Sequence, residues 1–111
     1  MNFKKGEVWF ASFPYDDDSN TFSNRPVVVM DENNLGVLSV KITKHAVREY
    51  DSYDVPIVYW EEAGLKLAST ARVAKVVVLQ PDDFIFKIGN LNADDLEKVE
   101  EALVDYLKNN I

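Results

Sequence analysis

Short runs of apolar, β-branched and aromatic residues, separated by turn-forming residues, occupy most of this chain up to residue 90. Their length and composition are typical of β-strands, and the glycine, proline, aspartate and asparagine residues between them predict turns. In residues 8–13 almost every side chain is apolar or aromatic, which predicts a strand covered on both faces, as in a small barrel. Further strands are expected at residues 27–30, 37–44, 55–60, 76–79 and 84–88. The chain is therefore predicted to be mainly β.

One helix is expected at the C-terminal end, over about residues 93–109. Asn92 is suited to cap it, and Asp94 and Asp95 fall in its first turn, where the helix dipole favours anions. Apolar residues recur at helical spacing at Leu96, Val99, Leu103 and Leu107. This stripe either packs on the sheet or contributes to a dimer face, and its periodicity fits both. With the strands over about residues 5–90, the whole chain of 111 residues is expected to form one domain.

The formal net charge of −7 disfavours a nucleic-acid partner at first sight, because such proteins usually carry a basic surface that displaces counterions from phosphates. The charge is unevenly spread along the chain, however. Residues 1–24 carry two basic against four acidic residues, residues 25–75 carry seven against seven, and residues 76–111 carry three against eight. The balanced middle segment still allows a local cationic groove.

The chain contains no cysteine, so it has neither a disulfide framework nor a thiolate metal site, and a reducing compartment is expected. Its N-terminal sequence lacks the apolar run of a signal peptide, and no stretch approaches the roughly 20 apolar residues of a membrane helix. We therefore expect a soluble, cytoplasmic protein without a membrane partner.

Several familiar catalytic arrangements are missing from the sequence. One histidine and no cysteine exclude the common zinc sites and disfavour a nucleophilic triad, and the four glycines are too widely spaced for a phosphate-binding loop. Acidic residues cluster at 16–18, 61–62 and 82–83, where solvated loops or turns are expected rather than a metal site. Neither a metal ion nor a cofactor is therefore expected.

The segment at residues 15–24 is rich in aspartate, serine and asparagine, which predicts an exposed loop of ten residues. This length exceeds that of most hairpin connections, which favours a functional role. Arg25 follows at the mouth of the loop. Pro26 holds Arg25 extended, because the residue before a proline is disfavoured in the helical region.

Cationic and hydroxyl side chains supply the remaining chemistry. The candidates are Arg25, Lys41, Thr43, His45, Arg72 and Lys75. Alternation along residues 37–44 places Lys41 and Thr43 on one polar face, with His45 just beyond them. Such groups suit a phosphodiester, because RNA cleavage by the neighbouring 2′-hydroxyl needs only positioning, proton movement and stabilisation of negative charge. An arginine fork matches phosphate oxygens, and a threonine hydroxyl donates one more hydrogen bond.

Four sequence motifs occur in order over nearly the whole chain: GEVWFASFP, RPVVVM, VKITKH and STARVAKVVVLQ. Together they resemble the PemK/MazF family of toxin endoribonucleases. The resemblance implies an SH3-like small antiparallel β-barrel with a C-terminal helix, working as a homodimer. It also implies a toxin of a type II toxin–antitoxin system that cleaves single-stranded RNA, including mRNA, sequence-selectively and without a metal, and so inhibits growth. A cognate antitoxin protein would restrain it by covering the active groove.

Carried over by position, the family's catalytic arginine falls on Arg25 and its catalytic threonine on Thr43. The resemblance implies that Arg25 neutralises the scissile phosphate and protonates the leaving oxygen, and that Thr43 orients the phosphate. The alternatives are a surface arginine paired with a carboxylate and a threonine that serves only the strand. The candidates for substrate binding are Phe13, Ser23, Asn24, Lys41, His45, Arg72 and Lys75.

Alternatives stay open for several of these residues and for the function. Arg72 and Lys75 either line the RNA path or form structural salt bridges, and His45 is either a base or an ordinary exposed histidine. The aromatic residues available to stack on unpaired bases are Tyr15, Phe22 and Phe13, the last of which suits the core equally. The alternative function is a non-catalytic toxin or binding module of the same fold, either a gyrase poison or a degenerate antitoxin-binding member.

Overall fold

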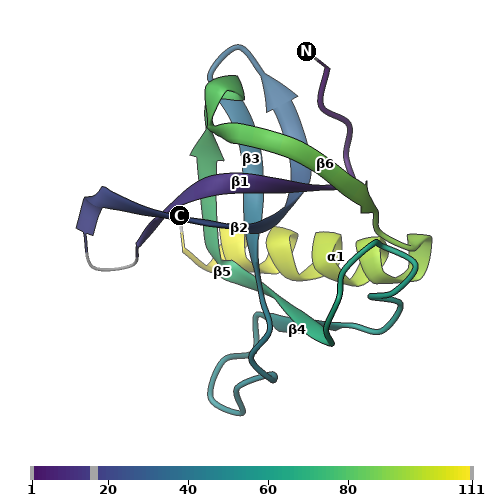
Figure 1. Cartoon of the computed structure of the whole chain (residues 1–111). Coiled ribbons are helices and arrows are strands. Elements are labelled where there is room, and N and C mark those ends of the chain that lie inside the picture. Colours follow the sequence, from purple (N-terminus) through teal and green to yellow (C-terminus); the bar gives the residue numbers. More distant parts are fainter. Residues whose placement is uncertain (1, 16–17, 111) are drawn as a thin grey trace.

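The computed structural model describes residues 2–15 and 18–110 (Figure 1). Its strands are β1 (Glu7–Tyr15), β2 (Asp18–Asn33), β3 (Gly36–Thr43), β4 (Asp54–Ile57), β5 (Ser69–Leu79) and β6 (Phe84–Asn90). The short 3₁₀ helix η1 (Pro81–Asp83) joins β5 to β6, and the helix α1 (Ala93–Asn109) follows β6. The mainly β fold with a C-terminal helix that the sequence predicts is confirmed.

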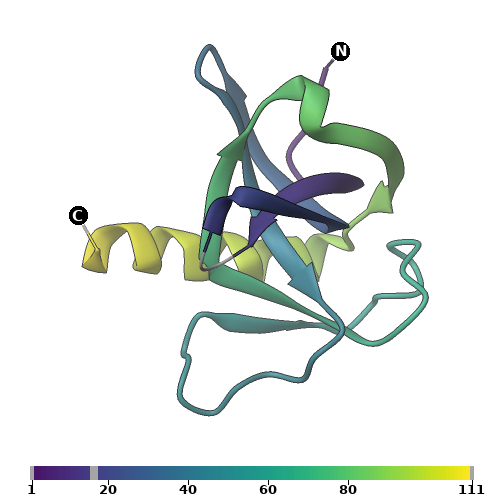
Figure 2. The ribbon, with the colours of Figure 1, turned by 60° about the vertical axis from the view of Figure 1, so that its left-hand side comes forward.

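All six strands belong to one antiparallel sheet in the order β4-β5-β3-β2-β1-β6. The sheet is strongly bent, so that β1 and β6 cross the direction of β3 and β5 (Figures 1 and 2). One bend lies in β5, where the partner of β3 jumps from Val76 to Arg72 between neighbouring residues of β3. Residues 73–75 bulge out of the ladder there, which redirects the first half of β5 toward β4.

Two apolar clusters explain the uninterrupted valine run of β2. Val28 packs in the cluster that also holds Val99 and Leu103 of α1. Val27 and Val29 pack in the second cluster, which is rich in aromatic side chains. Because neighbouring residues of a strand point to opposite faces, a strand covered on both sides needs apolar residues at successive positions.

The helix α1 begins as the sequence predicts. The Asn92 side chain caps it by accepting a hydrogen bond from the Asp94 backbone N–H at 2.8 Å. Val99 and Leu103 of the apolar stripe are buried, whereas Leu107 in the last turn is 43% exposed. Within the described residues, no helix has the length and hydropathy that a membrane span requires.

The end of β4 is determined by a carboxylate of α1. Asp95 is only 1% exposed, and it accepts hydrogen bonds from the backbone N–H groups of Val58 at 3.1 Å and Tyr59 at 2.9 Å. The strand expected over residues 55–60 therefore stops at Ile57, because the next two N–H groups bind the helix rather than another strand.

The prediction that residues 15–24 form a loop is wrong, although Thr21, Phe22 and Asn24 are exposed as expected. β1 continues through Tyr15 and β2 begins at Asp18, so most of this segment belongs to a long β-hairpin. Its backbone partners include Ser12↔Asn24, Phe13↔Ser23 and Pro14↔Phe22. Pairing with β1 satisfies the backbone polar groups and outweighs the weak strand propensity of serine and asparagine. Asp16 and Asp17 lie outside the described residues.

Candidate functional site

A groove of about 830 Å³ opens where β3 ends beside the middle of β2, next to β1, β6 and the loop between β4 and β5. Its described lining comprises residues 24–26, 42–45, 64–67 and 86–88, together with Phe10 and Ser69. The groove is thus assembled from segments that are far apart in the sequence. Its volume lies within the range of small-molecule and cofactor sites.

Positive charge is concentrated in this groove. The described lining carries the four cationic side chains of Arg25, Lys44, Lys66 and Lys87, and contains no aspartate or glutamate. Lys87 is partly neutralised, since its Nζ lies 3.2 Å from Oε2 of Glu7. In a chain with a net charge of −7, this local excess favours an anionic ligand at this place.

Arg25 is oriented by Ser23, two residues earlier on β2. The Nε and Nη2 groups of Arg25 donate to the Ser23 hydroxyl oxygen at 3.2 and 2.9 Å. Residues two apart on a strand point to the same face, so this contact follows from the extended backbone. One edge of the guanidinium is therefore held in place before any ligand binds, which suits recognition of phosphate oxygens.

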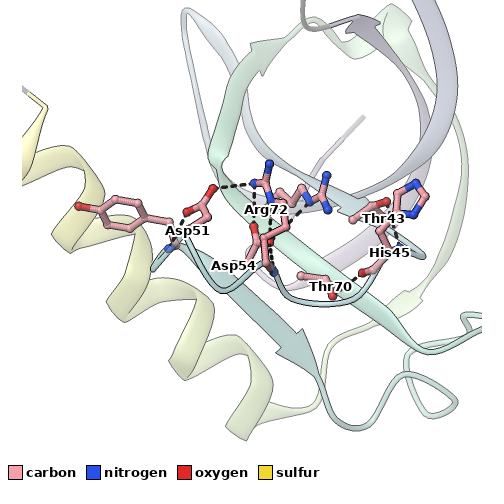
Figure 3. A network of polar contacts seen from close by, with 8 residues as sticks. Thr43, His45, Asp51, Asp54, Thr70 and Arg72 are labelled. Carbon is pink, nitrogen blue, oxygen red and sulfur yellow. Dashed lines mark hydrogen bonds and ion pairs between the residues drawn. The ribbon is translucent and has the colours of Figure 1, made fainter.

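Thr43 lies at the end of β3, where the chain turns toward the loop that precedes β4. Its side-chain oxygen accepts a hydrogen bond from the His45 backbone N–H at 3.3 Å, so its own proton is available to a second partner. Thr70 of β5 donates a hydrogen bond from its hydroxyl to the His45 carbonyl at 2.8 Å (Figure 3). This bond ties the turn after β3 to β5. The Thr43 hydroxyl is thus a positioned donor at the groove.

The strand register brings Arg25 and Thr43 to the same level of the sheet. Val27 of β2 pairs with Lys41 of β3 at the end of their ladder; Arg25 precedes Val27 by two residues and Thr43 follows Lys41 by two, so in this antiparallel pair both lie just beyond the ladder on the same side. Both residues also line the groove. Two hydrogen-bond donors from adjacent strands therefore belong to one groove.

An ion-pair network supports the turn that follows Thr43 (Figure 3). The Nε and Nη2 groups of Arg48 donate to the two carboxylate oxygens of Asp54, each at 3.0 Å, and the Arg48 backbone N–H donates to Asp54 at 3.0 Å. Arg48 also donates to Asp51 at 2.6 Å, and Arg72 Nε lies 3.8 Å from Asp54 Oδ2. Burial alone raises the pKa of Asp54, but the hydrogen bonds from Arg48 and the charge of Arg72 outweigh it and hold the pKa below its usual value.

Four of the predicted site residues meet in the groove: Asn24, Arg25, Thr43 and His45. Five others lie outside its described lining: Phe13, Ser23, Lys41, Arg72 and Lys75. Ser23 nevertheless contacts Arg25 directly. Arg72 lies beside the buried Asp54 with only 13% of its side chain exposed, so the structural salt bridge is the alternative that the structure favours.

Phe13 lies in the core, and this corrects the prediction that its ring stacks on RNA bases. The residue is 2% exposed and belongs to the same apolar cluster as Trp9 and Phe84. Phe22 is 50% exposed but lies outside the described lining of the groove. The side chain of Tyr15 is outside the part of the chain that the structure describes.

Two aromatic residues that the sequence analysis does not single out line the groove. Phe10 and Phe86 stack with ring centroids 5.2 Å apart and an angle of 26° between the rings. Side chains alternate between the two faces of a strand, so their spacing of three residues on β1 places Phe10 and the buried Phe13 on opposite faces. The sequence could have distinguished them on this ground. No local pattern places residues 64–67 or 86–88 beside the end of β3, because these contacts depend on the tertiary fold.

Close backbone contact holds the β4–β5 loop against β6 and so forms one wall of the groove. Gly64 has a φ of +88°, and a Cβ atom at this position would lie 2.7 Å from the Ile88 carbonyl oxygen. A Cβ atom at Gly89 would collide with the carbonyl oxygen of Ala63. Both the positive φ and the lack of space require glycine at position 64.

Several solved structures share this fold. An endoribonuclease from Mycobacterial species, solved in complex with its cognate antitoxin, superposes with a TM-score of 0.72 at 16% identity, covering 97% of this chain and 96% of that chain. The Mycobacterium tuberculosis toxin MazF-mt6 gives a TM-score of 0.69 at 20% identity, covering 92% and 96%. A MazE–MazF structure from Deinococcus radiodurans gives 0.66 at 14% identity, covering 96% and 95%.

The family is established by sequence. No curated protein matches the chain significantly. The model of the family described as "PemK-like, MazF-like toxin of type II toxin-antitoxin system" matches residues 4–107, nearly the entire chain. That match confirms the resemblance carried by the four motifs, and the structural similarities agree with it in fold. The chain therefore belongs to the PemK-like, MazF-like toxins of type II toxin–antitoxin systems.

Proposed function

We propose that this toxin is a metal-independent, sequence-selective endoribonuclease that cleaves single-stranded RNA. The observation that supports the proposal is the groove that Arg25 and Thr43 line together with the cationic residues Lys44, Lys66 and Lys87. Two proteins of similar structure are endoribonucleases, which supports the same reaction here. Positive charge at one place in an otherwise acidic chain suits a ligand with a phosphate backbone.

The proposed reaction is attack of the 2′-hydroxyl oxygen on the adjacent phosphorus. A bond forms between the 2′-oxygen and phosphorus, the bond to the 5′-oxygen breaks, and the products are a 2′,3′-cyclic phosphate and a free 5′-hydroxyl. Negative charge grows on the phosphate oxygens during this step, and positioned donors stabilise it. Arg25 supplies the guanidinium and Thr43 supplies one hydroxyl donor.

The groups that move protons in the proposed reaction differ from those that stabilise the negative charge. An arginine keeps its proton in proteins, so Arg25 acts here as a fixed cation, and the leaving 5′-oxygen takes its proton from water in the groove. This differs from the acid role that the resemblance implies for Arg25. His45 carries the only imidazole of the chain and lines the groove, which makes it the candidate base for the 2′-hydroxyl proton.

We further propose a homodimer and a cognate antitoxin as the protein partners. Two of the similar structures contain a toxin together with its antitoxin. An antitoxin segment with acidic residues would complement the cationic lining and block access to Arg25 and Thr43.

The decisive experiment uses purified protein, mixed-sequence single-stranded RNA and EDTA, with the cut ends mapped. We expect discrete cuts that leave cyclic phosphate. Arg25→Ala should lower the cleavage rate by about a hundredfold or more, as for removal of a donor that stabilises developing charge. Lys98→Ala is the matched control, since it removes one exposed cation from α1, outside the described lining of the groove, and should cleave normally.

Three results would contradict the proposal. Full activity in Arg25→Ala would show that Arg25 is not a catalytic residue. Cleavage that requires a divalent cation would show that the reaction depends on a metal. A folded protein that does not cut RNA would favour the non-catalytic toxin of the same fold.

A further inference from the structure

The stacked pair of Phe10 and Phe86 leaves a large apolar surface exposed in a charged groove. Phe86 lies on β6, at the edge of the sheet, and is 54% exposed. Its ring is backed by Phe10 at a centroid distance of 5.2 Å and an angle of 26°. The contact holds the Phe86 ring while much of the residue remains open to solvent.

The position of the pair is fixed relative to the proposed catalytic residues. Phe10 pairs with Phe86 of β6 on one side and with Pro26 of β2 on the other. These three residues form a row across adjacent strands, and directly opposed side chains share a face of the sheet. Neighbouring strands are about 4.8 Å apart, so the backbone of Phe86 is about 10 Å from that of Pro26. Arg25, the residue before Pro26, pairs with Ala11 and so starts from the opposite face of β2, and the groove is the place where it and the aromatic pair come together.

The surroundings of the pair indicate the chemistry of its ligand. The groove that Phe10 and Phe86 line also carries Arg25, Lys44 and Lys66, which attract anions. A flat apolar surface beside several cations fits a ligand with flat rings and a negatively charged backbone. Single-stranded nucleic acid has both, and its bases stack on aromatic side chains.

We propose that Phe86, supported by Phe10, stacks on a base of single-stranded RNA next to the cleaved phosphate. This inference rests on the proposed ribonuclease function and adds the place at which a flanking base is held. It transfers the stacking role from Phe13, which is 2% exposed, to residues that line the groove. A base held on Phe86 restrains the strand so that a phosphate lies between Arg25 and Thr43.

The test measures binding, so that it does not depend on the chemical step. The probes are a pool of single-stranded RNA octamers with 2′-O-methyl groups throughout, which 2′-hydroxyl attack cannot cleave, and an abasic strand of the same length and charge. The variants are Phe86→Ala and Phe86→Trp. Ile85→Ala is the matched control, because Ile85 is the neighbouring residue of β6, is similarly exposed at 51%, and lies outside the described lining of the groove.

Phe86→Ala should weaken binding of the octamer pool by about tenfold or more and leave binding of the abasic strand unchanged. Phe86→Trp should bind the pool at least as well as the wild type, and Ile85→Ala should bind both probes normally. Light scattering should give the same oligomeric state for all four proteins.

Several results would overturn the inference. One is unchanged binding of the pool by Phe86→Ala, and another is equal loss on both probes. A change of oligomeric state in Phe86→Ala, with no change in the preference for bases, would assign this surface to a contact between protein chains instead. If Arg25→Ala abolishes cleavage while Phe86→Ala binds normally, the ribonuclease function stands and the stacking role fails. If the wild type neither binds nor cuts RNA, both fail.

Discussion

Arg25 and Ser23 form the smallest unit of the site that can be tested by itself. The Ser23 hydroxyl accepts two hydrogen bonds from the guanidinium, at 3.2 and 2.9 Å, although Ser23 does not appear in the described lining of the groove. Its role in the proposed reaction is therefore to position Arg25 rather than to contact RNA.

Ser23→Ala should lower the RNA cleavage rate by about five- to tenfold, much less than Arg25→Ala, because the guanidinium remains but loses its orientation. A hydrogen bond to a charged group is worth about 1.5 kcal/mol, which sets this scale. Single-turnover rates measure the effect. Ser23→Thr keeps the hydroxyl and should recover most of the activity.

Ser12→Ala is the control for Ser23→Ala, since Ser12 is a partly buried serine on the neighbouring strand β1. It should cleave RNA normally. Equal rates for Ser23→Ala and the wild type would show that Arg25 needs no support from Ser23.

The residues of the site differ in how far the sequence could predict them. Arg25, Thr43 and His45 lie in the quoted motifs and Asn24 directly precedes one, and all four line one groove in the structure. Phe13 shows where this reasoning failed. A phenylalanine among apolar neighbours suits a binding surface and a core equally, and only the packing of both sheet faces decides between them.

At the scale of elements, the segment between β3 and β4 is held by Arg48, Asp51 and Asp54. The carboxylate of Asp54 is fully buried and receives two side-chain hydrogen bonds and one backbone hydrogen bond from Arg48. This arrangement stabilises the turn that follows Thr43 and carries His45, and it makes the stability of the fold depend on pH.

Because the pKa of Asp54 is lowered in the folded state, its contribution to stability is complete above the ordinary aspartate value of 3.8 and is lost as the pH falls through the folded value. Asp54→Asn should reduce the free energy of unfolding at pH 7 by about 3 kcal/mol, the scale for breaking a buried ion pair. It should also reduce the loss of stability below pH 4. Urea unfolding at several pH values measures both effects.

Asp51→Asn is the matched control, because Asp51 is partly exposed and accepts only one of the Arg48 side-chain hydrogen bonds. It should cost about 1 kcal/mol. If the stability of Asp54→Asn falls with acid as steeply as that of the wild type, Asp54 is not the group that responds to pH.

Elements were predictable from the sequence where local pattern and tertiary pairing agree. The helix α1 matches its expected bounds, since capping and apolar spacing are local signals. The polar half of β2 was not predictable, because residues 18–24 form a strand only through pairing with β1. The early end of β4 likewise depends on Asp95, which is 36 residues after Tyr59.

At the scale of the whole molecule, net charge and local charge have opposite signs. The chain carries −7, whereas the described lining of the groove carries cations only. The total charge therefore gives little guidance to the ligand. Two double variants with the same net charge, one changed in the groove and one changed on α1, distinguish the effect of local charge from that of total charge on RNA binding.

Lys44→Ala/Lys66→Ala should weaken binding of the uncleavable RNA octamers and reduce the slope of log affinity against log salt by about 0.7 for each lysine that contacts a phosphate. Lys98→Ala/Lys108→Ala makes the same change in net charge on α1 and should leave the slope unchanged. Fluorescence anisotropy titrations at several salt concentrations provide the measurement. Equal changes in both double variants would mean that RNA responds to the total charge and not to the groove.

The contact between residues 63–64 and β6 also bears on how such a toxin changes its target. Glycine backbones set the distance between the β4–β5 loop and β6, and no side chain lies between Gly64 and the Ile88 carbonyl to alter it. Residues 65–67 line the groove beside this contact; Leu65 packs against the core cluster, whereas Lys66 and Leu67 are exposed. Under the proposed ribonuclease function, substitutions at residues 66 and 67 change the chemical groups presented to RNA and leave the backbone contact at Gly64 in place, so we expect this loop to be a place where the cleavage sequence can change without a change of fold.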